Sequence, residues 1–540
     1  MKINKNIKII LIFTIFILLI IISRYPFTGH EVGLDSFSNH VMIDSLTSNG
    51  YAKWVLNPLS YFQLYPLSRS SGVPFLTASL ESIINISTEN TIFLCSIFFA
   101  FLGSLGLFML FHKFENSKSI LFLCVTLFII SPIYIYYSFW TLSYRILFFV
   151  LIPYFYYSLF MIKDWRFIPI LFLLGFGLLT AHRLALVAVP LSVIVFPIYH
   201  ILKRYFGSTS LSQFFSYHHN ISSAIILLLL LILFLIQFSQ IPLFPKEFQT
   251  QFSEGTLFES NSVIPRTLNL GINYFGNVGL FLFLFPFSIF QINDSKKLSS
   301  PWLFFLILIM IYLPTTLVND YASILLFIPL FIFTLEGIKY AMIKFDKKIL
   351  KAIFISILLI VSGVFSIYMS QRKITNTYQT QLEWLQWEPS DQLIETSTYV
   401  KFTFSDGFIS NDALSLLRLS AYSGVPFPDI TLNLLIFDYV NASQISVGTN
   451  QNPIGIFNRD IFVFNDQNRI ATEISKLVNI QDNSTYLLRL KYDIKYYISS
   501  QFLNGKTYEA EHIRDFPEDL KIKSSRFNLY SNNEYSMYFL

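Results

Sequence analysis

Charged residues are scarce in this chain of 540 residues, because Asp, Glu, Lys and Arg together make up only 13%. Hydrophobic residues make up 54% and aromatic residues 18%, and the mean hydropathy is +0.54. This composition is too apolar for a soluble protein of such length and is typical of a polytopic membrane protein. We therefore expect a multi-pass protein of the cell membrane, with the lipid bilayer as its first partner.

Cysteine and clustered positive charge are also lacking. The chain has two cysteines, Cys95 and Cys124, and both lie in apolar stretches. Neither a disulfide framework nor a cysteine-based metal site is therefore expected. The net charge of +5 is spread along the chain without a basic block, so no nucleic-acid partner is expected.

Long apolar runs predict eleven membrane spans, since a helix needs about 20 apolar residues to cross the hydrocarbon core. The runs lie at about 7–23, 91–111, 119–138, 145–162, 167–181, 184–201, 223–240, 276–292, 302–318, 322–342 and 352–369. The first run follows three lysines and has no small-residue cleavage site after it, so we interpret it as an anchor and not as a signal peptide. The Lys and Arg residues between spans then place the N-terminus in the cytoplasm.

The stretch 167–201 needs a break, because a single helix of that length would be about 50 Å long and the apolar core of a bilayer is about 30 Å thick. Thr180, His182 and Arg183 stand in its middle and are the natural place for the break. Two short spans would then meet at the outer surface. The alternative is one tilted helix with a His-Arg pair inside the membrane.

An odd number of spans places the end of the chain outside the cell. Residues 371–540 mix apolar runs with polar residues, and we expect an external, soluble α/β domain there. Its predicted elements are a helix at 378–399, a strand at 407–410, a helix after 412, strands at 430–437 and 460–464, a helix at 467–478 and a strand at 492–499. The predicted fold is thus a polytopic α-helical membrane domain, 1–370, with a large first external loop, 24–90, and an external C-terminal α/β domain.

The first loop carries the most informative polar residues. Glu31 and Asp35 stand four residues apart near the start of a predicted helix at 34–48, and His40 follows. A carboxylate at a membrane interface can deprotonate a hydroxyl group or hold a divalent cation against a phosphate. Alternatively, Asp35 only caps the helix and His40 is an ordinary surface residue.

Several short motifs in the same loop carry a family resemblance. They are Gly33-Leu34-Asp35-Ser36-Phe37-Ser38-Asn39-His40, Gly50-Tyr51-Ala52-Lys53-Trp54, Asn57-Pro58, Tyr65-Pro66 and Gly72-Val73-Pro74. In this order they resemble the first external loop of the GT-C membrane glycosyltransferases, which include oligosaccharyltransferase catalytic subunits and protein O-mannosyltransferases. The nearer likeness is to uncharacterised, largely prokaryotic relatives.

The resemblance implies a donor, a cofactor and a role for one residue. Members of the superfamily use polyprenyl-phosphate or polyprenyl-diphosphate sugars, and the acid of the first loop is their catalytic or metal-binding carboxylate. By position, that role falls on Asp35, with Glu31 beside it and Mg²⁺ or Mn²⁺ as the cation to consider. Two features depart from the pattern. The second acidic motif of many members is absent, because 139–143 reads Phe-Trp-Thr-Leu-Ser, and the Trp-Trp-Asp-Tyr-Gly motif of oligosaccharyltransferases is absent too.

Other external residues could complete a site. His182 could ligate a metal ion together with Asp35, and His182 and Arg183 could bind a lipid phosphate. The loop 241–275 contains Glu259 and Arg266 and is long enough to cover a lipid-linked donor. The alternatives are a His-Arg pair that only reaches to the interface and loop residues that are merely solvated.

The sequence thus predicts an integral membrane glycosyltransferase, inverting, that moves a sugar from a polyprenyl-phosphate donor to a glycan, lipid or protein acceptor on the outer face. Asp35 and Glu31 would be catalytic, and His40, His182, Arg183, Glu259 and Arg266 would bind the substrates. One alternative is a non-catalytic assembly or binding protein with the same fold. The other is a transporter of lipid-linked glycans, which should place ionisable residues at the bilayer midplane; only the His182-Arg183 region offers them.

Overall fold

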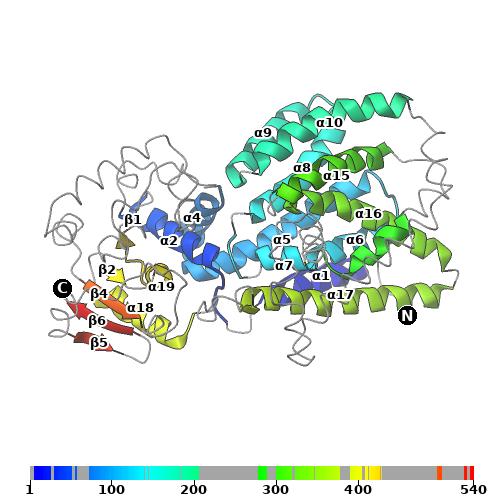
Figure 1. Ribbon diagram of the computed structural model, residues 1–540. Coiled ribbons are helices and arrows are strands. Elements are labelled where there is room, and N and C mark those ends of the chain that lie inside the picture. The colour runs from blue at the N-terminus through cyan, green and yellow to red at the C-terminus, as the bar shows by residue number, and fades with distance from the viewer. Residues whose placement is uncertain are drawn as a thin grey trace, which may run out of the picture. The chain divides into compact units, whose positions relative to one another are not determined.

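The computed structural model divides into two compact units (Figure 1). The first contains Met1–Tyr25, Ile97–Phe139 and Arg145–Lys373, and the second contains Pro26–Ser96, Trp140–Tyr144 and Ile374–Leu540. The described residues are 5–25, 29–50, 55–56, 72–138, 140–143, 145–182, 184–205, 276, 278–288, 300–318, 323–345, 347–376, 389–403, 408–410, 413–425, 427–428, 496–500, 528–531 and 535–539.

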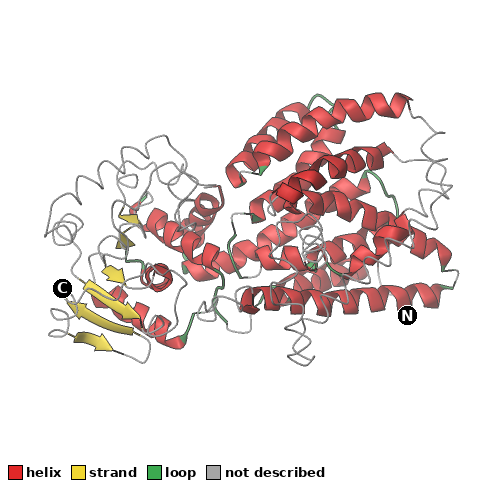
Figure 2. Ribbon diagram, viewed as in Figure 1, coloured by secondary structure: helices red, strands yellow, loops and turns green. Residues whose placement is uncertain are grey.

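The first unit consists of helices in its described part (Figure 2). They are α1 (Lys5–Ile22), α6 (Lys118–Ile129), α7 (Pro132–Ser138), α8 (Ile146–Phe160), α9 (Phe167–Ala181), α10 (Ala185–Tyr205), the 3-10 helix η3 (Leu280–Leu284), α15 (Ser300–Val318), α16 (Ser323–Lys344) and α17 (Lys348–Asn376). Helix α5 (Thr88–His112) contributes residues to both units. Aromatic side chains fill the contacts between helices: Phe128 packs against Phe327 and Phe331, and Phe160 packs against Phe304.

Four described helices are long and apolar enough to cross a membrane: Thr88–His112, Ala185–Lys203, Ile324–Lys344 and Ile349–Met369. Helices α6 and α7 would form a fifth span if the bend of 57° between them lies within one crossing. The protein is therefore a multi-pass membrane protein. The total of eleven spans and the sides on which the termini lie stay predictions; 223–240 lies outside the described residues and 276–292 is described only in part.

The predicted break near residue 182 is confirmed. Helix α9 ends at Ala181, His182 is extended with φ −159° and ψ 143°, and α10 begins at Ala185. A second break, between α6 and α7, is held by Arg24, which is fully buried. Its guanidinium donates to Ser138 Oγ at 2.9 Å and to the carbonyl oxygen of Ile129, at the end of α6, at 3.1 Å. A cation at a helix C-terminus also interacts favourably with the helix dipole.

The second unit combines short helices with two sheets. Its helices are α2 (Leu34–Asn49), α4 (Gly72–Ile84), α18 (Asp391–Thr403) and α19 (Ala413–Ser423), and its strands are β1 (Val55–Leu56), β2 (Phe408–Ser410), β3 (Phe427–Pro428), β4 (Tyr496–Ser500), β5 (Asn528–Ser531) and β6 (Tyr535–Phe539). The larger sheet has the order β2-β4-β6-β5, in which β2 and β4 are parallel and the other pairs antiparallel. Strands β1 and β3 pair in parallel, with Val55 opposite Phe427.

Part of the described C-terminal segment corresponds to predicted elements. Helix α18 overlaps the predicted helix 378–399, whereas strands β3, β5 and β6 were not predicted. Strand β2 and helix α19 lie at the predicted strand 407–410 and the predicted helix after 412, and β4 overlaps the predicted strand 492–499. The predicted elements at 430–437, 460–464 and 467–478 lie outside the described residues. The α/β character of the whole segment and a domain boundary at residue 370 therefore stay predictions. The residues of the first loop belong to the same unit as the C-terminal segment.

Candidate functional site

The first loop contains the predicted helix, and two hydrogen bonds fix its start. Gly33 precedes α2 with φ 98°, a conformation that suits glycine, and Gly50 ends the helix with φ 74°. Residues 140–143 lie beside this start: the Val32 amide donates to the Trp140 carbonyl at 3.1 Å, and the Leu142 amide donates to Ser36 Oγ at 2.9 Å. The position of α2 is thus set by main-chain hydrogen bonds and not by side-chain packing alone.

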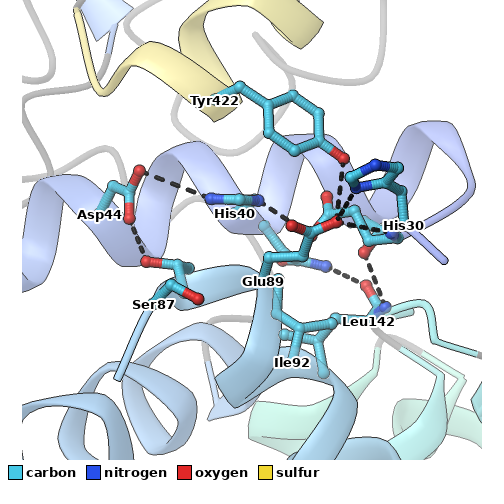
Figure 3. A network of polar contacts seen from close by, with 12 residues as sticks. His30, His40, Asp44, Ser87, Glu89, Ile92, Leu142 and Tyr422 are labelled. Atoms are coloured by element: carbon cyan, nitrogen blue, oxygen red, sulfur yellow. Dashed lines mark hydrogen bonds and ion pairs between the residues drawn. The ribbon is translucent and has the colours of Figure 1, made fainter. Parts of the chain in front are cut away.

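The imidazole of His40 lies between two carboxylates, those of Glu31 and Asp44. Figure 3 shows His40 and Asp44 on the same helix. His40 Nδ1 lies 2.9 Å from Glu31 Oε2, and His40 Nε2 lies 3.6 Å from Asp44 Oδ2, one helical turn further along α2. Glu31 and His40 are both buried. The second oxygen of Glu31, Oε1, has no hydrogen-bond partner in the described part of the chain.

Burial and charge act in opposite directions on these three side chains. Burial disfavours a charged His40, but the carboxylates of Glu31 and Asp44 outweigh it and raise the pKa of His40 to about 9. Burial also raises the pKa of Glu31 and of Asp44 above their usual ranges, and His40 only partly opposes these rises. His40 is therefore an imidazolium at neutral pH. It can hold two carboxyl groups in place, but it is not available as a base.

A third carboxylate, Glu89 in the first turn of α5, is contacted by polar groups of the first loop and of α19 (Figure 3). Its Oε1 lies 3.0 Å from the amide of Glu31, 3.0 Å from His30 Nδ1 and 3.4 Å from the hydroxyl of Tyr422. Trp140 Nε1 donates to the Glu89 carbonyl at 3.1 Å. The side chain of Glu89 is nevertheless 21% exposed, so this carboxylate is both oriented and accessible.

The network continues from Asp44 through Thr88 to Glu81 of α4. The Thr88 hydroxyl contacts Asp44 Oδ1 and lies 2.9 Å from Glu81 Oε1. A hydroxyl has one hydrogen, so Thr88 can donate to only one of these acids at a time. Burial raises the pKa of Asp44 and of Glu81 above their usual ranges, and the contact with Thr88 only partly opposes these rises.

Helix α19 of the C-terminal segment packs against α2 and covers the network with an aromatic ring. The centroid of the Tyr422 ring lies 5.7 Å from that of His40 and 6.1 Å from that of Phe37. Burial, reinforced by Glu31 and Glu89, raises the pKa of Tyr422 far above its usual value, so its hydroxyl stays a donor. Arg418, one turn earlier in α19, lies over the Phe37 ring.

The structure brings together only some of the predicted site residues. Glu31 and His40 are hydrogen-bonded, and His40 is not the surface residue that the simpler interpretation assumed. Asp35 is the second residue of α2, and its side chain lies outside the described structure. His182 belongs to the first unit, where it is buried and its Nδ1 accepts from the Leu184 amide at 3.1 Å. Arg183, Glu259 and Arg266 lie outside the described residues.

Sequence reasoning missed Asp44, Glu81, Glu89, His30 and Tyr422. Asp44 could have been found, because it stands four residues after His40 on the same helix. No local pattern indicates Glu89 or Tyr422. Within the described residues, no group of three or more His, Cys, Asp or Glu side chains is arranged to hold a metal ion. A divalent cation at Asp35 and His182 stays a prediction.

Comparison with known proteins identifies a related fold. The sequence matches no protein-family model, and no curated protein is similar to it at a significant level. The structure is similar to crystal structures of the Archaeoglobus fulgidus oligosaccharyltransferase, a GT-C enzyme, with a TM-score of 0.53 at 10% sequence identity. The match to the apo form covers 91% of this chain and 69% of the archaeal chain. The match to the form tethered by a disulfide bond to an acceptor peptide with the NVT sequon covers 92% of this chain and 69% of the archaeal chain. The chain therefore has a fold like that of an oligosaccharyltransferase.

Proposed function

We propose that this protein is an integral membrane glycosyltransferase that transfers a sugar from a polyprenyl-phosphate donor to a hydroxyl group of a glycan, lipid or protein at the outer face of the membrane. The fold supports the enzyme class, since it is similar to that of an oligosaccharyltransferase. The network around Glu89 and Glu31 supports the chemistry, because transfer of a sugar to a hydroxyl group needs a fixed carboxylate that can take the hydroxyl proton.

One observation carries the proposal: three polar groups, two from the first loop and one from α19, meet on one oxygen of a carboxylate that remains partly exposed. Glu31 is also an acid of this network, but it is fully buried and already bonded to His40. We assign the base to Glu89 for this reason. The sequence assigned the catalytic role to Asp35 and Glu31, and Asp35 remains the second candidate because it begins the same helix.

The proposed step is a single displacement. The carboxylate of Glu89 takes the hydroxyl proton of the acceptor while the hydroxyl oxygen bonds to the anomeric carbon of the sugar. The bond from that carbon to the phosphate oxygen breaks, and the polyprenyl phosphate leaves with the electron pair. Attack from the face opposite the phosphate inverts the anomeric centre.

The remaining assignments concern the donor phosphate. His182 and Arg183 would bind it, and Glu259 and Arg266 would cover it, as the sequence predicts. Mg²⁺ or Mn²⁺ held by Asp35 would neutralise charge on the departing phosphate. The displacement above is written in terms of protein groups, and the cation would act on the leaving phosphate alone.

The test is transfer by the purified protein in lipid nanodiscs, supplied with a radiolabelled polyprenyl-phosphate hexose and a mixture of glycan, lipid and peptide acceptors. Glu89→Gln should lower turnover by about a hundredfold or more, the usual scale for a general base. Glu395→Gln is the matched control, because Glu395 is exposed on α18. Equal turnover of Glu89→Gln and wild type would remove Glu89 from the mechanism. An inactive wild-type protein would favour a non-catalytic binding protein with the same fold.

A further inference from the structure

Helix α4 has two faces of different chemistry. Its buried face carries Val73, Pro74, Thr77 and Ala78. The opposite face exposes four large apolar side chains: Phe75 (43%), Leu76 (41%), Ile83 (78%) and Ile84 (45%). No Lys or Arg stands between Gly72 and Ile84. Isolated apolar side chains are common at protein surfaces, but four on one short helix indicate an interaction surface.

The other side of α4 is part of the candidate site. Helix α4 packs against α2. Glu81 of α4 lies 3.4 Å from Thr47 Oγ1, on α2, and 2.9 Å from Thr88 Oγ1, at the start of α5. Any partner that binds the apolar face therefore sits one helix diameter from the acidic network, about 10 Å.

The chain itself indicates what covers this face. Asn85, with φ 58°, ends α4, and α5 begins at Thr88. Four residue steps span at most about 14 Å, so Ile84 lies within that distance of the start of α5. Helix α5 is a candidate membrane span and exposes Leu94 one to two turns into the helix. The exposed end of α4 is thus tied to the point at which the chain enters the bilayer.

The length of α4 decides its orientation. It has 13 residues and is about 20 Å long, which is too short to cross an apolar core of about 30 Å. A helix that is apolar on one face only and too short to span lies in the plane of the interface, with that face among the upper acyl chains.

We propose that α4 lies in the interfacial layer of the bilayer, with Phe75, Leu76, Ile83 and Ile84 in contact with lipid. The contact fixes the depth of the acidic network relative to the phosphate headgroups. A lipid-linked donor has its phosphate at the same depth, and this consequence alone rests on the proposed function. The lipid contact does not.

The experiment places a fluorescent label on α4 in the full-length protein. Ile83→Cys is labelled with the environment-sensitive dye NBD and reconstituted into phosphatidylcholine vesicles with and without brominated acyl chains. Wild type is the background control, because both native cysteines are buried. Glu395→Cys on α18 is the matched exposed position. Ile84→Cys serves as a second variant if Ile83→Cys does not fold.

We expect the Ile83 label to emit at short wavelength and to be quenched at least about twofold by brominated lipid, as in a helix seated in the interface. The Glu395 label should stay unquenched. Emission typical of water would overturn the proposal. Emission at short wavelength without quenching by bromine would also overturn it, since a second copy of the chain or another segment would then cover the face. No outcome depends on transferase activity.

Discussion

Stability should fall as the pH rises through the titration of His40. His40 is charged in the folded protein with a pKa of about 9, compared with 6.5 when it is unperturbed. A raised pKa means that the folded state binds the proton more tightly, so the contribution is complete below about pH 6.5 and is lost as the pH rises through about 9. The two pKa values correspond to a contribution of at most about 3 kcal/mol.

The variant His40→Gln isolates this contribution. It removes the positive charge between Glu31 and Asp44, and a buried carboxylate without its partner is strongly destabilising. Wild type should exceed the variant by about 3 kcal/mol or more near pH 6, and the difference should shrink by most of that amount near pH 10. The pKa values of Glu31 and Asp44 are also raised in the folded protein, so their titration lowers stability with rising pH as well. That fall begins at acid pH, where unfolded carboxyl groups titrate, and so starts before the fall caused by His40.

The assay is denaturant titration in matched detergent at a series of pH values, followed by tryptophan fluorescence. Trp140 is buried beside Glu89 and reports on this region. His200→Gln is the control, because His200 is exposed on α10 and its removal should leave the loss of stability between about pH 7 and about pH 10 unchanged. A difference between wild type and His40→Gln that stays constant from about pH 6 to about pH 10 would refute a charged His40.

Three further predictions test the sequence assignments. A tag at the C-terminus should be accessible from outside intact cells and one at the N-terminus should not; protection of the C-terminal tag would contradict the eleven-span topology. Asp35→Asn should keep expression and membrane insertion but lose transfer by about a hundredfold if Asp35 is base or metal ligand, whereas a large fall in expression would support a capping role. Arg183→Lys should weaken use of the lipid-linked donor in a donor titration, because Arg binds phosphate through paired donors that Lys cannot reproduce; unchanged donor dependence would remove Arg183 from the donor site.

The sequence located several of the long helices because their signal is local, but it missed α4 and the break between α6 and α7. A long apolar run shows where a helix must be, and α5 and α16 lie within a few residues of the predicted spans 91–111 and 322–342. The break at His182 followed from the length of the apolar stretch 167–201 alone. The helix in the first loop followed from the spacing of polar and apolar residues between 34 and 48. Each of these inferences uses residues that are neighbours along the chain.

The candidate site is not local, so most of it could not be predicted. Glu89 takes its donors from His30 and Glu31 of the first loop and from Tyr422, a residue 333 positions further along the chain. No periodicity relates such distant residues. Residues 139–143 lack the second acidic motif of many GT-C enzymes, yet Trp140 and Leu142 of this segment supply main-chain and indole groups that contact the start of α2 and Glu89.

The four acids of the network differ in their surroundings. Glu31 and Asp44 lie beside His40, Glu81 lies beside Thr88, and Glu89 lies beside His30. Burial raises the pKa of Glu31, Asp44 and Glu81 above their usual ranges. Glu89 is hydrogen-bonded by main chain, imidazole and phenol and is still partly exposed. Partial exposure together with three polar groups on one oxygen is the combination that makes Glu89 the proposed base.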